Sequence, residues 1–385
     1  MPRNNPVSKV GTPLPSSIKP ATAGLKILHV VRQFHPHRGG LEDFVANLGR
    51  EQVLTGCDVR ILTCDRTFSH PERRLPAQAI FDGMKIQRVP FYGSTRYPLV
   101  PSLLRHLGDA DIVHVHAIDF FFDALALTKP LHRKPLVATT HGGFFHTVDH
   151  AGLKRLWFNG PTRLSARAYG AIVGCSESDA AQFSQIAGER VLTIENGVDL
   201  SKFPGSASGN LVRSIVTVGR FSKNKRLDRL IAMTTELRQR NPAWHLHIAG
   251  IPSDLGPSDL QGMIDAAGVS SNMTVHVDLT DSDLRDLFAC ASFFVSASEY
   301  EGFGIALIEA MSAGFRCFVH PNASFRTLAA RHSSVRLADF SDPANVADML
   351  EAAYSHPEAS KTPDLSDHAW SSVAERYRSV YFGLV

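Results

Sequence analysis

Two glutamates eight positions apart flank a glycine turn that is suited to binding hydroxyl groups. Glu301 precedes glycines 302 and 304, and Glu309 lies in the apolar, helix-like stretch that ends at Gly314. Glycines let the backbone approach a ligand closely, and the free N–H groups at a helix start point toward that ligand. The two carboxylates can then accept hydrogen bonds, one from sugar and one from ribose hydroxyls. Taken alone, this spacing is more often a pair of solvated side chains.

Two cations stand at a second strand–turn–helix unit. Arg220 and Lys225 follow the apolar run 214–218, at the point where a helix is expected to begin. Two cations together with helix N–H groups would hold a diphosphate, although either residue alone could be an exposed loop charge. A Gly39-Gly40 pair follows the first apolar run of the chain. It is not a dinucleotide fingerprint, and a plain tight turn would explain it equally well.

The composition indicates a globular protein without a metal or disulfide framework. Its 385 residues are 44% hydrophobic and 20% charged, with a net charge of +3 that is too small to indicate nucleic acid. Five scattered cysteines contain no C-x-x-C pair, which suits a reducing cytoplasm. No acidic D-x-D pair follows a strand, so we expect cations and helix dipoles to neutralise a diphosphate without a metal. No apolar run could span a bilayer, and residues 1–24 are predicted to be a disordered leader.

The elements that must position these residues alternate between strands and helices, which predicts mostly parallel α/β sheets covered on both faces. The length favours two domains, 25–204 and 211–366, followed by an amphipathic helix within 367–385. In the first domain, strands are expected at 26–31, 58–64, 84–89, 111–116, 135–140, 171–175 and 190–194. Ligands bind beyond the carboxyl ends of such strands. The polar residues expected there are His114, His116, Asp119, His141 and Glu177.

Three stretches of the first domain favour an amphipathic acceptor and a membrane, each with an ordinary alternative. Residues 96–107 and 119–131, which include Asp119 and Phe120, are apolar enough for a lipid-binding groove, although core packing explains most of this. Basic and aromatic side chains then alternate over 154–169, which suits an anionic membrane surface or a solvated helix. Those basic and aromatic side chains are Lys154, Arg155, Trp157, Phe158, Arg163, Arg167 and Tyr169.

The segment E-G-F-G-I-A-L-I-E-A-M-S-A-G resembles the nucleotide-sugar loop of retaining glycosyltransferases with two Rossmann-like domains, the GT-B enzymes of family 4. G-R-F-S-K-N-K and I-E-N-G-V-D-L-S-K-F are similar to the family's phosphate loop and domain-boundary loop. The resemblance implies two domains facing across a cleft, with a C-terminal helix that returns to the first domain. It also implies metal-independent front-face transfer with retention of configuration.

The resemblance assigns a role to each candidate residue. It implies diphosphate binding by Arg220, Lys225, Gly39 and Gly40, and contacts to the donor sugar and phosphates by Gly302, Phe303, Gly304 and Ile305. It implies ribose binding by Glu309 and nucleobase binding by Leu279 and Thr280. His141 and Glu301 would be the catalytic residues beside the transferred sugar. Glu299 is an extra acid next to Glu301, and the sequence leaves open which of the two faces the sugar.

A narrower resemblance concerns the substrates. H-V-V-R-Q-F-H-P, S-T-R-Y-P-L-V-P-S and T-H-G-G-F-F-H-T are similar to the α-mannosyltransferases of xanthan- and acetan-type exopolysaccharide assembly. This implies transfer from GDP-mannose to a cellobiosyl unit on a polyprenyl diphosphate, with an α-1,3 linkage, by a peripheral enzyme at the cytoplasmic face of the inner membrane. The residues themselves do not choose guanine over uracil or mannose over glucose.

Three other functions fit the same scaffold. One is a hexosyltransferase with another donor or acceptor, and a second is a nucleotide-sugar epimerase or a phosphorylase, since a fold does not fix a function. The third is a catalytically silent subunit that binds a nucleotide sugar or a membrane. An epimerase would isomerise the donor in the absence of any acceptor, which separates it from a transferase.

Overall fold

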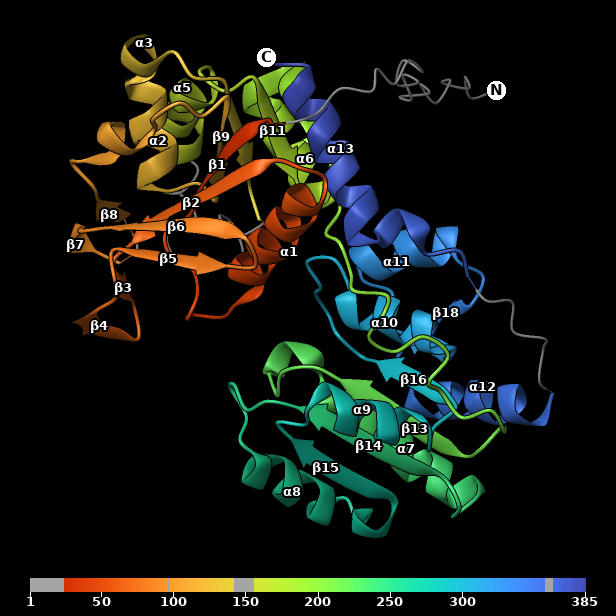
Figure 1. Cartoon of the computed structure of the whole chain (residues 1–385). Helices are drawn as coiled ribbons and strands as arrows, with labels where there is room; N and C mark the ends of the chain where they lie inside the picture. The colour runs from red at the N-terminus through yellow and green to blue at the C-terminus, as the bar shows by residue number, and fades with distance from the viewer. Residues whose placement is uncertain (1–23, 96, 142–155, 357–362) are drawn as a thin grey trace, which may run out of the picture.

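The computed structural model describes residues 24–95, 97–141, 156–356 and 363–385. Within them the chain forms two parallel sheets, each covered by helices on both faces and arranged one beside the other (Figure 1). This is the α/β architecture predicted from the sequence. Almost all of the expected leader, together with Lys154 and Arg155, lies outside the described residues.

The first sheet has eight strands in the order β12-β11-β10-β9-β1-β2-β6-β5. Its parallel strands are β1 (Lys26–Val30), β2 (Asp58–Cys64), β6 (Met84–Val89), β9 (Ile112–His116), β10 (Leu136–Thr139), β11 (Ala171–Gly174) and β12 (Val191–Thr193). The edge strand β5 (Gln78–Phe81) is antiparallel to β6 and was not expected. Two small hairpins, β3 (Arg66–Thr67) with β4 (His70–Arg74) and β7 (Tyr92–Ser94) with β8 (Tyr97–Leu99), were not expected either.

Two apolar layers cover the first sheet. One layer contains α2 (Phe120–Leu127), α5 (Arg163–Ala166) and α6 (Glu177–Ala187), and the short α3 (Lys129–His132) follows α2. Val100, Leu103 and Leu107 are buried in this layer, so the apolar stretch 96–107 serves the core, as the ordinary alternative had it. The other layer is made by α1 (Gly40–Leu54) and by the C-terminal helix α13 (Trp370–Phe382).

The second sheet is wholly parallel and has six strands in the order β15-β14-β13-β16-β17-β18. These are β13 (Ser214–Val218), β14 (His245–Gly250), β15 (Met273–Val277), β16 (Phe293–Ser296), β17 (Arg316–Val319) and β18 (Val335–Leu337). One face carries α7 (Leu227–Arg240), α8 (Pro257–Ala266) and α12 (Pro343–Ser355). The other carries α9 (Asp281–Phe288), α10 (Ile305–Ala313) and α11 (Ala323–Arg331).

The chain crosses between the two halves twice, and the two crossings are bonded to each other. The Val198 N–H donates to the His368 carbonyl at 2.7 Å, and Val198 and Ala369 form a parallel bridge. After the second crossing, α13 runs along the first half (Figure 1) and buries Tyr377 and Tyr381 there. The predicted return of the C-terminal helix is therefore confirmed, while the boundaries at 204, 211 and 366 stay predictions.

Gly197 is required at the first crossing because of its packing against α13. A Cβ atom built on it would lie 2.3 Å from Cδ2 of Trp370, far inside van der Waals contact. The indole thus packs directly on the backbone of residues 194–203, the boundary loop between the two halves. Within the part of the chain that the structure describes, no helix has the length and apolar character that crossing a bilayer requires.

Candidate active site

The carboxyl edge of the second sheet brings Lys225 and Glu301 together. The Lys225 Nζ lies 2.6 Å from the Glu301 Oε1, and both side chains are about one-fifth exposed. Gly219, at φ +158°, directly follows β13, the strand before Lys225, and a Cβ atom there would lie 3.2 Å from the Lys225 Cε. The lysine therefore folds back over the strand end toward the glycine turn. The sequence predicted both residues at a ligand site but not their ion pair.

The turn that carries Glu301 is fixed by side chains from neighbouring segments. The Asn224 side-chain amide donates to the Tyr300 carbonyl at 2.7 Å and accepts from the Tyr300 N–H at 3.1 Å. The Ser324 hydroxyl donates to the Glu301 carbonyl at 2.6 Å. These bonds satisfy the backbone of a loop that has no sheet or helix partners. Asn224 was missed in the sequence because an asparagine between two lysines carries no distinguishing local pattern.

Glu299 and Glu301 have different partners. The Glu299 carboxylate is half exposed and binds Arg226 and Arg229, the latter at 3.1 Å. Glu301 binds Lys225 and is much less exposed. This arrangement favours Glu301 as the carboxylate that faces a bound sugar, and the assignment stays a prediction.

The glycine turn leads directly into α10. Gly304 has φ +97°, and a Cβ atom there would lie 3.1 Å from the Phe325 ring, so both conformation and space require glycine. It occupies the N-cap position, and Ile305 then opens the helix with its side chain exposed. Phe303 is buried, with its ring 5.7 Å from that of His368. We therefore expect Gly302–Ile305 to offer backbone N–H groups rather than side chains to a ligand.

A cavity of about 470 Å³ lies between the two halves. Its lining includes Gly40 and the start of α1 from the first half, and Ile305 and Glu309 from α10 of the second. Residues of the boundary loop and Trp370 of α13 complete it. Sequence reasoning had missed His35, His37, Arg38, Asn47, Asn196, Asp199, Lys202 and Trp370, which all line this cavity. The predicted Gly39-Gly40 turn and the predicted ribose ligand Glu309 thus meet at one space.

Glu309 is largely shielded from water at the wall of this cavity. Burial raises the pKa of its carboxyl to about 7, while the nearby Lys202 opposes this shift and Asp281 and Asp199 add to it. A carboxyl with such a pKa changes protonation near neutral pH, so hydroxyl binding at this position would depend on pH.

The predicted nucleobase residues lie at the start of α9, outside the lining of the cavity. The Thr280 hydroxyl caps the helix, accepting from the Asp283 N–H at 3.2 Å, and Leu279 is partly buried. Lys202 reaches Asp281 at 3.2 Å and joins this helix start to the boundary loop. The base-binding role of Leu279 and Thr280 stays a prediction.

Arg220 differs from Lys225 in being exposed. It lies beside Gly219 and Lys225 around a small hollow at the end of β13. Among the residues that the structure describes, no carboxylate pairs with it within 4.0 Å. Its guanidinium is therefore available for an anion that enters the cleft.

In the first half, His141 follows β10 in a left-handed conformation with φ +54°. Histidine tolerates this region better than most residues, and such a conformation persists only where the surroundings fix it. The Phe44 ring packs edge-on against the imidazole at 4.7 Å, and the Cys175 sulfur lies 3.9 Å from its Nδ1. Burial lowers the pKa of His141 to about 3, so the ring is neutral at physiological pH.

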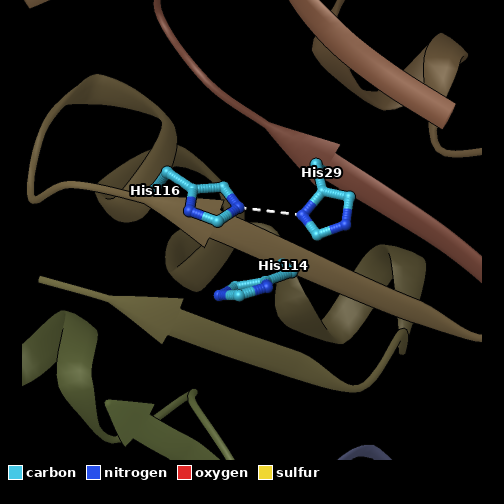
Figure 2. Close-up of side chains that lie close together, drawn as sticks. All are labelled: His29, His114 and His116. Atoms are coloured by element: carbon cyan, nitrogen blue, oxygen red, sulfur yellow. Dashed lines mark hydrogen bonds between the residues drawn. The ribbon is translucent and has the colours of Figure 1, made fainter. Parts of the chain in front are cut away.

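His114 and His116 do not lie beyond the strand end, contrary to the prediction from the sequence. Both side chains point from β9 into the layer beneath α1 and α13, where they are fully buried beside His29 of β1 (Figure 2). His29 and His116 are hydrogen-bonded at 2.8 Å. Nitrogen atoms of the three histidines lie within 4.8 Å of one another, the arrangement among the described residues that is closest to a metal-ligand set.

The two predicted acceptor residues have different environments. The Asp119 carboxylate is 2% exposed, pairs with Arg32 at 3.0 Å and caps α2 by accepting from the Phe121 N–H. Burial raises the pKa of this carboxyl to about 7. Phe120 is partly exposed, with its ring edge-on to that of Tyr97 at 5.6 Å. A direct contact between Asp119 and an acceptor stays a prediction, and its partner Arg32 is the more exposed of the two side chains.

Of the predicted membrane residues, Lys154 and Arg155 lie outside the described residues. The helices α2, α3 and α5 lie on the side of the first half away from the second sheet (Figure 1), and the other predicted residues are on or near them. Trp157 is 45% exposed there, and Arg163 and Arg167 are also exposed. Large apolar side chains are exposed here too, two of them from the apolar stretch 119–131 that was considered for a lipid-binding groove. Those side chains are Leu127, Leu131, Leu156 and Leu164, each between 66% and 83% exposed.

Comparison with known proteins places this geometry in a family. Residues 38–202 match the family described as Glycosyltransferase Family 4, and residues 207–364 match Glycosyl transferases group 1. Among solved structures, a glycosyltransferase from Rickettsia africae superimposes with a TM-score of 0.71 at 14% identity, over 93% of this chain and 98% of that one. Sucrose-phosphate synthase from Thermosynechococcus elongatus gives 0.69 at 14% identity over the same shares. These two likenesses support the fold alone.

Relatives of higher identity define the family more narrowly. A protein of Komagataeibacter xylinus named GDP-mannose:cellobiosyl-diphosphopolyprenol alpha-mannosyltransferase is 41% identical over 93% of each chain. A protein of the same name from Xanthomonas oryzae pv. oryzae is 40% identical over 93% of this chain and 96% of its own. The chain belongs to the group 1, family 4 glycosyltransferases. The predicted enzyme class and fold are thereby confirmed.

Proposed function

We propose that this enzyme transfers mannose from GDP-mannose to a cellobiosyl unit on a polyprenyl diphosphate, with retention of configuration and an α-1,3 linkage. The observation that carries the proposal is about 40% identity, along nearly the whole chain, to enzymes named for this donor and acceptor. Glu309 in the lining of the cavity between the halves, and the Lys225–Glu301 pair at the carboxyl edge of the second sheet, support the same proposal.

The second half would stabilise the leaving GDP. Lys225 and Arg220, together with the N–H groups that open α10, supply positive potential where negative charge develops on the diphosphate. Entry of the donor would replace the Lys225–Glu301 contact by a lysine–phosphate contact and would free Glu301 to bind sugar hydroxyls. In this proposal these groups neutralise the diphosphate, and a metal ion is not required.

The first half would hold the transferred sugar and the acceptor. Gly40 approaches the donor diphosphate from across the cleft, and His141 binds the sugar with a neutral imidazole. The acceptor hydroxyl attacks from the face that the diphosphate leaves, and a phosphate oxygen takes its proton. Glu301 orients the sugar in this scheme and forms no covalent bond.

The exposed surface on α2, α3 and α5 would place the enzyme at the cytoplasmic face of the inner membrane. Its leucines and Trp157 would insert among the lipid headgroups, while Arg163 and Arg167 would bind anionic lipid. A lipid-linked acceptor enters from that side, so the surface would keep the first half close to its substrate.

A donor panel tests the proposed reaction. GDP-mannose, UDP-glucose and UDP-N-acetylglucosamine are each incubated with the enzyme and a short polyprenyl-diphosphate cellobiose analogue. We expect product from GDP-mannose only, with an α-1,3 linkage by NMR. Product from another donor alone would overturn the donor assignment, and isomerised GDP-mannose without acceptor would indicate an epimerase.

Liposome sedimentation tests the membrane surface. Replacing Lys154, Arg155, Arg163 and Arg167 with glutamine should reduce co-sedimentation with anionic vesicles. Replacing Leu131 and Leu164 with serine should reduce it further. Arg238→Gln with Arg240→Gln, on α7 of the second half, is the matched control and should leave binding unchanged. Equal sedimentation of all variants would eliminate this surface as the anchor.

A further inference from the structure

A continuous chain of hydrogen bonds runs through the buried layer of the first half and ends at His141. The His141 Nε2 lies 3.0 Å from the His116 Nδ1, and the His116 Nε2 lies 2.8 Å from the His29 Nδ1 (Figure 2). The His29 Nε2 lies 2.7 Å from the Gln52 Oε1. Three imidazoles, two from strands β1 and β9 and one from the loop after β10, are thus joined in series to one side-chain amide of α1.

The carbonyl oxygen of Gln52 fixes the direction of every bond in this chain. An amide oxygen can only accept, so His29 must donate from Nε2. A neutral imidazole carries one proton, so the His29 Nδ1 then accepts from the His116 Nε2. By the same argument the His116 Nδ1 accepts from the His141 Nε2. His141 is therefore protonated at Nε2 and carries its acceptor lone pair on Nδ1.

Two conditions make this argument hold. Burial lowers the pKa values of His29 and His141 to about 4 and about 3, and that of His116 well below its usual value, so all three rings are neutral. At the far end, burial raises the pKa of the Cys175 thiol to about 12, so the sulfur keeps its proton. That proton can be donated weakly to the His141 Nδ1, 3.9 Å away, in the direction that the Gln52 oxygen requires.

The other end of the Gln52 amide contacts the C-terminal helix. The Gln52 Nε2 donates to the Tyr381 hydroxyl at 3.2 Å, and that hydroxyl lies 2.7 Å from the His114 Nδ1. His114 continues on a separate branch to Thr139 at 2.8 Å. Turning the amide over would offer a donor to His29 and would reverse the whole chain to His141. His114 lies in the same layer but off the path between Gln52 and His141.

The hydrogen bonds account for these histidines better than a metal ion does. A zinc ion needs ring-nitrogen lone pairs at roughly 2.0–2.1 Å, all pointing at one position. Every ring nitrogen of His29, His114 and His116 already has a hydrogen-bond partner in the protein. The network is thus complete without an ion.

We infer that Gln52, acting through His29 and His116, fixes His141 as the Nε2-protonated tautomer, so that its Nδ1 accepts a hydrogen bond from a substrate hydroxyl in place of the weak contact with the Cys175 thiol. Gln52, His29 and His116 are positioning residues for His141. The substrate contact of His141 rests on the proposed function, whereas its tautomer does not. A hydrogen bond of the wrong polarity at a buried contact leaves both partners unsatisfied, so the tautomer matters to binding geometry.

The test is the tautomer itself, read by two-bond ¹H–¹⁵N NMR of the full-length protein labelled with ¹⁵N-histidine. Loss of signals in the His141→Gln variant assigns the ring. We expect the wild-type His141 to be protonated at Nε2 alone between pH 6 and 8. Gln52→Met and His116→Leu should give a mixture of both tautomers. His116→Gln, which again offers one donor and one acceptor, should restore the single form.

His114→Gln is the matched control, since it alters an equally buried histidine of the same layer without cutting the path. It should leave the tautomer of His141 unchanged. In activity assays we expect Gln52→Met to lower kcat about fivefold, with a smaller change in KM for the acceptor.

Three results would overturn the inference. They are an Nδ1-protonated His141 in the wild type, an unchanged tautomer in both Gln52→Met and His116→Leu, and one equivalent of tightly bound zinc in the purified enzyme. The first and third need only the wild-type protein, so they remain decisive where a variant does not fold. Because the NMR measurement uses no substrate, a failure of the mannose assignment would leave the tautomer result standing.

Discussion

The two halves surround their predicted catalytic residues with opposite kinds of chemistry. At the end of the second sheet, charged side chains are paired at the protein surface, with Lys225 on Glu301 and two arginines on Glu299. In the first half, the predicted catalytic residue His141 is a neutral histidine at the end of a buried hydrogen-bond chain. One side offers mobile charge, and the other offers fixed, uncharged polarity.

This difference suits the two tasks in a sugar transfer. The leaving diphosphate carries most of the charge, so it requires cations that can exchange one anionic partner for another. The sugar and the acceptor carry hydroxyl groups, which require hydrogen-bond partners of known direction. A buried network provides such direction because reversing one bond would force all the others to reverse.

The largest effect should come from removing Lys225, the cation of the second half that is paired with Glu301. We expect Lys225→Ala to lower kcat roughly 10²- to 10³-fold, as for removal of one group that stabilises transition-state charge. Steady-state kinetics with GDP-mannose would measure it. Lys223→Ala, an exposed lysine two residues earlier, is the control and should stay near wild type. Similar losses in both variants would mean that the loop's overall charge matters, not Lys225.

A substitution at Gly197 should disrupt the packing between the two crossings of the chain. A Cβ atom would collide with Trp370, so Gly197→Ala should lower the free energy of unfolding by about 1–3 kcal/mol, as is usual for overpacking. Denaturant unfolding would measure this change. Gly209→Ala is matched to it, since nothing lies within 4 Å of a Cβ atom at that position. A loss in Gly209→Ala as large as that in Gly197→Ala would contradict the contact with Trp370.

The raised pKa of Glu309 predicts that GDP binding to the second half depends on pH. The ionised carboxylate accepts ribose hydroxyls, so GDP affinity should rise about tenfold between pH 6 and 8, across the pKa of about 7. The contribution of Glu309 to the stability of the nucleotide-free protein has the opposite dependence on pH. Because the folded pKa is raised above its usual value, this group's contribution is most favourable below pH 4.5 and falls as the pH rises toward 7.

Calorimetric titration with GDP checks this dependence. Glu309→Gln should bind GDP weakly and lose most of the pH dependence, while the exposed Glu72→Gln should retain it. A wild-type affinity that does not change between pH 6 and 8 would remove Glu309 as the ribose ligand.

The smallest effect is expected for the exposed cation. Arg220 has its guanidinium in solvent, where screening weakens its attraction for a diphosphate. Arg220→Ala should weaken GDP binding about three- to tenfold at low ionic strength and less at high salt. Equal losses at both salt concentrations would show that Arg220 is shielded from solvent when the nucleotide is bound.

Much of the charged side could be predicted from the sequence, because its determinants are local. Gly304 needs a positive φ, α10 follows directly, and Arg220 and Lys225 come straight after a strand. The central strands were also predictable, and residues 58–64 and 84–89 match β2 and β6. The short hairpins and β5 were missed, since their exposed, polar sequences lack a strong strand pattern.

The neutral side could not be predicted, because its bonds join residues far apart in the chain. Gln52 and Tyr381 are separated by 329 positions, and nothing near either residue indicates the other. His114 and His116 were expected in the cleft because histidines at a strand end often bind ligands. Their burial depends on α13, which packs over β9 although it follows the whole second half in the sequence.

The crossing of α13 has a consequence for how the protein is made. Residues 370–382 leave the ribosome after the entire second half, yet their tyrosines complete the interior of the first. During synthesis, His29 and His114 of the first half therefore stay uncovered until the second half has emerged. The core of the first half is complete only when α13 has packed on it.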